Sequence, residues 1–161
     1  MGEKLINELD GLRVAIEIEK RGHAFYQQAY NQATKDVHKE LFLLLRDEES
    51  HHMAKFQKVF DKVKENKAEV AFDEGTSKYL TVLASDHVFP KAEEAGSVIA
   101  DLKTMEAVLA VAMQAEKDSV LFYDELANKS DSDDAIKIFT ALKSEEQQHV
   151  IKLREMIDAW A

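Results

Sequence analysis

Cysteine is absent from this chain of 161 residues. Without thiols, the chain can form no disulfide, thiolate metal site or iron–sulfur cluster. Any metal ion would therefore be held by carboxylate and imidazole groups. Turn-forming residues are also scarce, with five glycines and one proline. The sequence is instead rich in Ala, Leu, Glu, Lys and Gln, which favour helix over strand.

A surplus of positive charge and a long apolar run are missing as well. The net charge is −10, so the surface would repel nucleic acids and anionic membranes. No apolar stretch approaches the ~20 residues that span a bilayer, and the first residues do not resemble a signal peptide. We therefore expect a cytoplasmic protein with no nucleic-acid or membrane partner. The apolar content of 45% predicts a substantial core.

The chain contains an internal repeat with an offset of 97 residues. Residues 12–63 and 109–160 share 16 identities over 52 ungapped pairs. A Glu-x-x-His motif at residues 49–52 recurs at residues 146–149. The chain is therefore built from two copies of one unit.

Apolar residues recur at intervals of three and four in four long segments, which predicts four amphipathic helices. The first begins near Leu5. We expect Thr34, Ser97 and Ser132 to begin the other three, because their side chains can accept hydrogen bonds from the first turn of a helix.

The two halves, residues 4–64 and 97–161, are separated by residues 65–96. A short helix is expected at residues 78–84. A helix of ~30 residues is about 45 Å long, and a connection of this size can return the chain along it. We predict an all-α fold in a single domain over residues 1–161, a four-helix bundle of two helical hairpins with one long crossover connection.

Six polar residues occupy the apolar faces of these helices. Glu and His three residues apart lie on one face and can bind one ion together. Four unpaired buried glutamates would be very unfavourable, whereas two divalent cations would neutralise them. A lone glutamate at such a position is more often at an edge or in solvent, but the common offset favours a metal site. The six residues are Glu19, Glu49, His52, Glu116, Glu146 and His149.

These motifs resemble those of the ferritin-like di-iron carboxylate proteins, in particular the rubrerythrin-type helical domain. The resemblance covers nearly the whole chain and implies two iron ions as cofactors, with zinc or manganese as possible replacements. The matching motifs are Glu19-x-x-Gly22-x-x-Phe25-Tyr26 and Glu116-x-x-Ser119-x-x-Phe122-Tyr123, each followed by Glu-x-x-His. The resemblance implies that Glu49 and Glu146 bridge the two ions. It also implies that Glu19 and Glu116 are terminal carboxylates and that His52 and His149 each bind one ion.

Two tyrosines lie near these residues. Tyr26 and Tyr123 stand two turns beyond Glu19 and Glu116, where a phenol can hydrogen-bond a ligating carboxylate. Plain core packing is the alternative. Of the remaining histidines, His23 is predicted to lie in the core. We expect His38, His51 and His87 to lie in solvent.

The chain departs from the rubrerythrin pattern in two ways. Ser119 stands where rubrerythrins usually have an extra glutamate, which makes the site symmetric and more like that of bacterioferritin. Because the chain has no cysteine, it has no rubredoxin domain, and electrons would come from a separate protein such as a rubredoxin.

The leading hypothesis is a non-haem di-iron oxidoreductase that reduces hydrogen peroxide or dioxygen and acts against oxidative stress. One alternative is a ferritin-like ferroxidase or iron-storage protein. Another is a structural bundle with a redox-inert dimetal site, because glutamate and histidine also accept zinc and manganese. We expect a homodimer, and the long crossover leaves domain swapping open.

Overall fold

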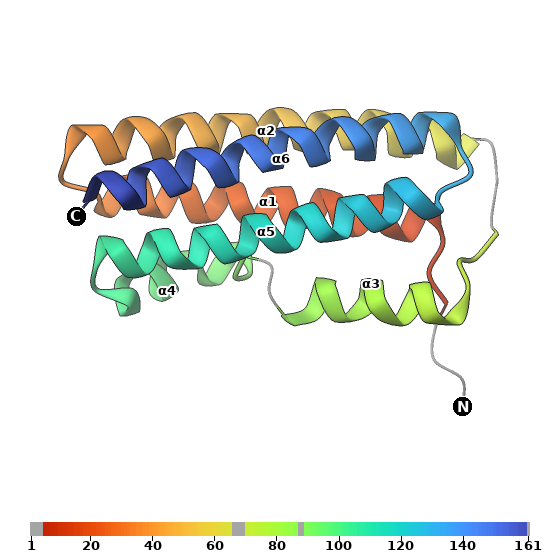
Figure 1. The fold of residues 1–161 in the computed structure, drawn as a ribbon, viewed down its shortest axis with the longest axis horizontal. Helices are drawn as coiled ribbons and strands as arrows, with labels where there is room; N and C mark the ends of the chain where they lie inside the picture. Colours follow the sequence, from red (N-terminus) through yellow and green to blue (C-terminus); the bar gives the residue numbers. More distant parts are fainter. Residues whose placement is uncertain (1–4, 66–69, 87–88, 161) are drawn as a thin grey trace.

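The computed structural model describes residues 5–65, 70–86 and 89–160. Within these ranges the chain is almost entirely helical (Figure 1). The elements are α1 (Glu8–Gln32), α2 (Asp36–Glu65), α3 (Glu74–Asp86), the short 3-10 helix η1 (Ala92–Glu94), α4 (Ala95–Leu102), α5 (Met105–Lys129) and α6 (Asp133–Trp160).

The four long helices form the bundle. Helix α1 packs along α2, and α5 packs along α6. The two hairpins meet through contacts of α2 with α6 and of α1 with α5 (Figure 1). The prediction of an all-α bundle of two hairpins is confirmed. No helix in the described part of the chain combines the length and apolar character that a bilayer span requires.

The crossover returns the chain along the bundle, from the end of α2 to the start of α5. Helices α3 and α4 lie below α1 and α5 in Figure 1, where α3 contacts α5 and α4 contacts α1. The predicted short helix at 78–84 is present and longer, as α3. The prediction that Ser97 begins the third long helix is wrong, because Ser97 lies inside α4.

The break before α5 occurs at Lys103, which has a left-handed backbone with φ of 63°. Thr104 then caps α5, its hydroxyl oxygen accepting a hydrogen bond of 3.2 Å from the Ala107 amide. Helix α2 begins at Asp36, and its first amide hydrogen bonds run to the Lys35 carbonyl. The prediction that Thr34 begins this helix is therefore wrong by one residue. The predicted cap at Ser132 is confirmed, because its hydroxyl oxygen accepts a bond of 3.3 Å from the Ala135 amide.

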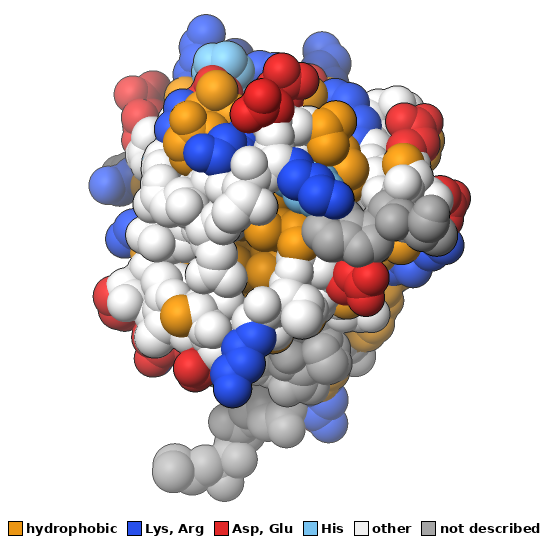
Figure 2. Space-filling model, turned by 90° about the vertical axis from the view of Figure 1, so that its left-hand side faces the viewer, with side chains coloured by type: hydrophobic (Ala, Val, Ile, Leu, Met, Phe, Trp, Pro, Cys, Tyr) orange, Lys and Arg blue, Asp and Glu red, His pale blue; other side chains and the backbone are white. Residues whose placement is uncertain are grey.

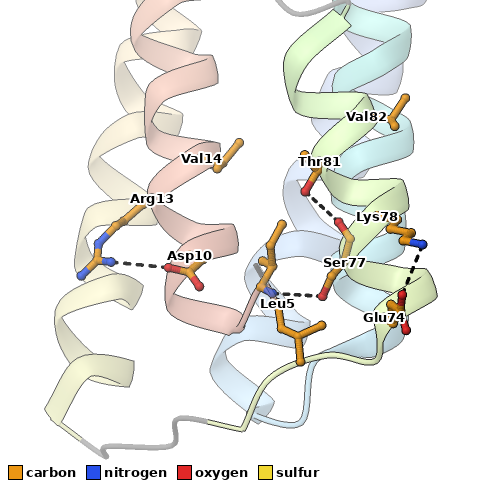
Figure 3. A pocket seen from close by; sticks show the side chains of 10 residues that line it. Leu5, Asp10, Arg13, Val14, Glu74, Ser77, Lys78, Thr81 and Val82 are labelled. Atoms are coloured by element: carbon orange, nitrogen blue, oxygen red, sulfur yellow. Dashed lines mark hydrogen bonds and ion pairs between the residues drawn. The ribbon is translucent and has the colours of Figure 1, made fainter. Parts of the chain in front are cut away.

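Helix α3 is fastened to the segment that leads into α1 (Figure 3). The Ile6 amide donates to Ser77 Oγ at 3.0 Å, and the Phe72 amide donates to the Ile6 carbonyl at 2.8 Å. Leu5, Ile6 and Val82 help to line an open groove of about 780 Å³ between α1 and α3. This groove shares no residue with the six candidate ligands.

The apolar core falls into two clusters, separated along the bundle by the candidate ligands. One cluster contains Phe56 and Phe139, and the other contains Phe25 and Phe42. Figure 2 views the bundle from the end where α1 turns into α2, and apolar side chains are visible between the helix ends. The six polar residues therefore lie at mid-length of the bundle, enclosed by apolar side chains at both ends.

Candidate metal centre

All six candidate ligands meet at the centre of the bundle, and each is at most 2% exposed. Their ligand atoms form two groups of three carboxylates and one imidazole, within which the atoms lie within 4.8 Å of one another. Glu49 and Glu146 belong to both groups. The groups are Glu19, Glu49, His52 and Glu146, and Glu49, Glu116, Glu146 and His149.

The helix period explains why these side chains converge. Helices α1 and α5 each contribute one glutamate, and α2 and α6 each contribute a Glu and a His one turn apart. At Gly22, an added Cβ would lie 3.0 Å from Glu49 Oε2 and 3.0 Å from Phe89, so the missing side chain makes room for both. The repeat-related Ser119 donates its hydroxyl to the Ala115 carbonyl at 2.9 Å and adds no carboxylate.

Two buried tyrosines connect the hairpins. Tyr26 Oη donates to Glu116 Oε1 at 2.6 Å, and Tyr123 Oη donates to Glu19 Oε1 at 2.7 Å. Each tyrosine therefore bonds to the glutamate of the other repeat and not to the glutamate on its own helix. Burial and then the charge of Glu116 raise the pKa of Tyr26 well above 10. Burial and then the charge of Glu19 raise the pKa of Tyr123 in the same way. Both phenols thus remain hydrogen-bond donors.

Sequence reasoning gave no role to Glu48 and Glu145, which lie next to the candidate ligands. Glu145 Oε2 lies 3.0 Å from His52 Nε2, and Glu48 contacts His149 Nε2. Glu48 forms a hydrogen bond with His149 Nε2, which fixes the ring orientation and leaves the other nitrogen for a metal. Glu145 contacts His52 at ion-pair distance but without hydrogen-bond geometry. In both rings Nδ1 faces the inner glutamates. The signal was present, because the same 97-residue offset relates Glu48 to Glu145.

The two shared carboxylates, Glu49 and Glu146, favour their neutral forms when no cation is bound. Burial raises the pKa of Glu49 well above its usual range, and the charges of Glu146 and Glu19 raise it further. Burial and the charge of Glu116 raise the pKa of Glu146 in the same way. Both groups therefore retain a proton to higher pH than an ordinary glutamate does, unless a cation replaces it.

The two histidines favour their charged forms. Burial alone would lower the pKa of His52, but hydrogen bonds with Glu146 and Glu19 raise it to about 10. The pKa of His149 is also raised against the effect of burial, mainly by the charge of Glu116. In the cation-free site both rings are imidazolium.

The outer pair of carboxylates, Glu19 and Glu116, stays ionised. Burial opposes this, but the positive charge of His149 and the hydrogen bonds around Glu116 lower the pKa of Glu116 to about 2. Hydrogen bonds with Glu49 and His52 lower the pKa of Glu19. In the cation-free centre the positive charge of the imidazoles therefore offsets the negative charge of the outer carboxylates.

The donor set fits two divalent cations. The four positive charges of two divalent cations balance the four negative charges of the carboxylates. Carboxylate and imidazole groups are suitable ligands for iron, manganese and zinc. Eight buried side-chain oxygens have no hydrogen-bond partner within the described structure, and four of them belong to the candidate ligands: Glu19 Oε2, Glu49 Oε1, Glu116 Oε2 and Glu146 Oε2. Buried polar atoms are rarely left unpaired, and coordination would satisfy all four.

The other histidines lie outside the cluster. The prediction that His38 is in solvent is wrong, because it is 4% exposed and lines a cavity with Met156 near the end of α6. His51 is exposed, as predicted, and His23 is half-buried and not in the core. His87 lies outside the described residues.

A helical bundle whose core holds a Glu from each of two helices and Glu-x-x-His from each of the other two has the architecture of the ferritin-like di-iron carboxylate proteins. The sequence model of the rubrerythrin family matches residues 10–157. The chain belongs to this family. It contains no cysteine, and no rubredoxin domain is evident.

A crystal structure from Thermotoga maritima, described as a ferritin-like diiron-carboxylate protein, superposes on the chain with a TM-score of 0.77. The two sequences are 28% identical, and the match covers 99% of this chain and 100% of that one. The predicted ferritin-like fold is therefore confirmed. No match was found among curated proteins.

Proposed function

We propose that this chain is a non-haem di-iron oxidoreductase that reduces hydrogen peroxide or dioxygen. The proposal rests on one observation above all: two overlapping Glu/His groups share Glu49 and Glu146 at the buried centre of the bundle. This arrangement supports a pair of ions joined by the two shared carboxylates. Of the remaining ligands, Glu19 and His52 would serve one ion, and their repeat counterparts the other.

Two ferrous ions bound there would supply one electron each to an O–O bond. For hydrogen peroxide the balance is two electrons and two protons, giving two water molecules. The side chains hold the ions, keep the centre enclosed by apolar residues and orient the ligating groups. The Tyr26 and Tyr123 phenols, which stay protonated, hold Glu116 and Glu19 in place.

The ferric ions would have to be reduced again after each turnover. A chain without cysteine carries no iron–sulfur or thiolate centre for this task. We therefore propose a separate electron-donor protein, such as a rubredoxin. The homodimer and the cytoplasmic location remain predictions.

Stopped-flow absorption tests the activity. Reduced, iron-loaded protein is mixed with stoichiometric hydrogen peroxide, and we expect rapid oxidation of both ferrous ions. Glu49→Gln keeps the size of the side chain but removes a shared carboxylate, and should abolish the rapid phase. Glu40→Gln, at an exposed position of the same helix, is the matched control and should react like the parent. Equal oxidation rates in all three proteins would contradict the proposal.

A ferroxidase or iron-storage function is the second candidate, and the symmetry of the site favours it. Ser119 adds no fifth carboxylate to the four of the site, and its hydroxyl is bonded to its own helix. Adding ferrous ion in large excess under air separates the two functions. A ferroxidase would oxidise many ferrous ions per chain and would form large assemblies, whereas the oxidoreductase would stop once its own pair is oxidised.

A protein that binds zinc or manganese tightly and shows neither activity would support the structural alternative.

A further inference from the structure

A polar pocket of about 340 Å³ opens between α2 and α6 directly over the centre. It reaches His52, and its other lining residues form three pairs related by the 97-residue offset. The pairs are Glu48 with Glu145, His51 with Gln148, and Lys55 with Lys152. The pocket therefore lies where the two repeats face each other, and His52 forms part of its lining.

Two matched chains of contacts connect the rim of this pocket to the centre. Lys55 Nζ lies 3.6 Å from Glu145 Oε1, and the other oxygen of Glu145 lies 3.0 Å from His52 Nε2. In the second chain, Lys152 Nζ lies 3.5 Å from Glu48 Oε1, and the other oxygen of Glu48 contacts His149 Nε2. Each outer glutamate is thus held between one ammonium group and one imidazole.

The imidazoles separate the pocket from the inner carboxylates. The rings of His52 and His149 are nearly parallel, with an interplanar angle of 14° and centroids 5.5 Å apart. Their side chains are 3% and 1% exposed, whereas those of Glu145 and Glu48 are 44% and 30% exposed. An ion on the direct path from the pocket to the inner glutamates therefore meets these rings. Turning either ring would break the contact between its Nε2 and the outer carboxylate.

We propose that the ion pairs Lys55–Glu145 and Lys152–Glu48 form a latch. By holding the outer glutamates against the imidazoles, the latch sets the rate at which divalent cations enter and leave the centre through this pocket. The inference rests on the proposed dimetal site and adds positioning residues and a route to it. Lys55 and Lys152 act through the outer glutamates and bind no metal themselves.

The test is the release of Co²⁺ from the loaded full-length protein to excess EDTA, followed by visible absorption. Lys55→Met with Lys152→Met keeps the length of both side chains but removes their charge. Exposed ion pairs are weak individually, so we expect the release rate to rise by about tenfold when both are lost. Lys55→Arg with Lys152→Arg keeps the charge and should retain slow release. If only the aliphatic stems of the lysines mattered, the Met variant would also release Co²⁺ slowly, because it keeps those stems.

A charge-matched control uses Lys58→Met with Lys137→Met, two exposed lysines on α2 and α6 that do not line the pocket. This variant should release Co²⁺ at the parental rate. Equal rates in the parent, control and latch variants would overturn the latch while leaving the metal site intact. Should the double variant not fold, Lys55→Met and Lys152→Met are measured separately, and each should accelerate release by a few fold. A parent that fails to bind two Co²⁺ ions per chain would instead overturn the proposed dimetal site.

Discussion

The hairpins α1–α2 and α5–α6 are alike at the centre and different on their outer faces. The six candidate ligands, the two tyrosines, the outer glutamates and the pocket lysines are identical pairs at the 97-residue offset. Outside, the second hairpin presents Leu121 and Ile151, which are 46% and 47% exposed, where the first has Ala24 and Ala54. Matching residues are therefore concentrated where side chains from both hairpins contact the same centre.

The largest difference near the centre is the pair Gly22 and Ser119. Phe89, from the crossover, packs against Phe25 and Tyr26 with ring centroids 5.3 and 5.4 Å apart. It also occupies the space that a side chain at position 22 would need. The crossover thus breaks the symmetry of the bundle on one side of an otherwise twofold site.

The largest effect is expected from removing both shared carboxylates. Glu49→Gln with Glu146→Gln leaves each group with one carboxylate and one imidazole, so Co²⁺ binding measured by calorimetry should be lost. If the repeats are equivalent, the two single variants should weaken binding to a similar extent, and by more than the ~100-fold that loss of a ligand's hydrogen-bond partner can cost. A double variant that still binds two ions at parental affinity would contradict the assignment of these ligands.

Gly22 and Ser119 should respond differently to alanine. Gly22→Ala places a Cβ 3.0 Å from Glu49 Oε2 and Phe89 and should lower the free energy of unfolding by about 1–3 kcal/mol, as other overpacked sites do. Ser119→Ala removes only a hydroxyl bonded to its own helix and should cost less than about 1 kcal/mol. Urea unfolding of both variants measures the difference. Equal losses would show that the crossover does not distinguish the two sides.

The tyrosines should instead behave alike. Tyr26→Phe and Tyr123→Phe each remove one buried hydrogen bond to an ionised glutamate, worth about 1.5–3 kcal/mol. Because the bonds cross between hairpins, each variant should weaken the contact between the repeats, and the double variant should lose at least the sum. The same unfolding assay applies. A loss in one variant only would mean that the pairing is not equivalent.

The smallest effect is a difference in pH dependence between cation-free and loaded protein. In the cation-free protein, Glu49, Glu146, His52 and His149 all have folded-state pKa values above those of the unfolded chain. Their contribution to stability is therefore present at low pH and is lost as pH rises, for His52 between its unfolded value of 6.5 and about 10. The melting temperature should fall by about 2–4 °C for each kcal/mol lost.

Loaded protein should show the opposite trend. Cations displace the protons from the shared glutamates and both imidazoles, so binding releases protons and the apparent metal affinity rises with pH. Melting curves at pH 6 and pH 9, with and without Zn²⁺, compare the two forms. Parallel pH profiles in both forms would show that the cation and the protons do not compete for the same groups.

Much of this site could be predicted from the sequence, because a repeat offset and a helical period together place side chains on the same face. Those two rules identified the six buried residues that the fold brings together. They could not identify contacts between hairpins, such as Tyr26 with Glu116, because the offset relates residues of equal position and not residues in contact. The offset does relate Glu48 to Glu145, but it does not show that each contacts a histidine of the other repeat.

The crossover was the least predictable part. The apolar periodicity runs through Leu102 into the third long helix and does not indicate a break. The break occurs at Lys103, whose left-handed backbone conformation is usually found at glycine. The packing of Phe89 against the centre likewise depends on the path of the crossover, which no local pattern specifies. No local pattern predicts the burial of His38, because this burial depends on tertiary packing beside α6.

The most direct test of the account is the metal content of the protein as purified, without added metal or chelator. Elemental analysis should give about two irons per chain, the number that the doubled ligand set holds, and the Glu49→Gln, Glu146→Gln variant should contain almost none. Less than about half an equivalent of any transition metal in the parent, with the variant folding equally well, would show that these buried glutamates do not bind metal.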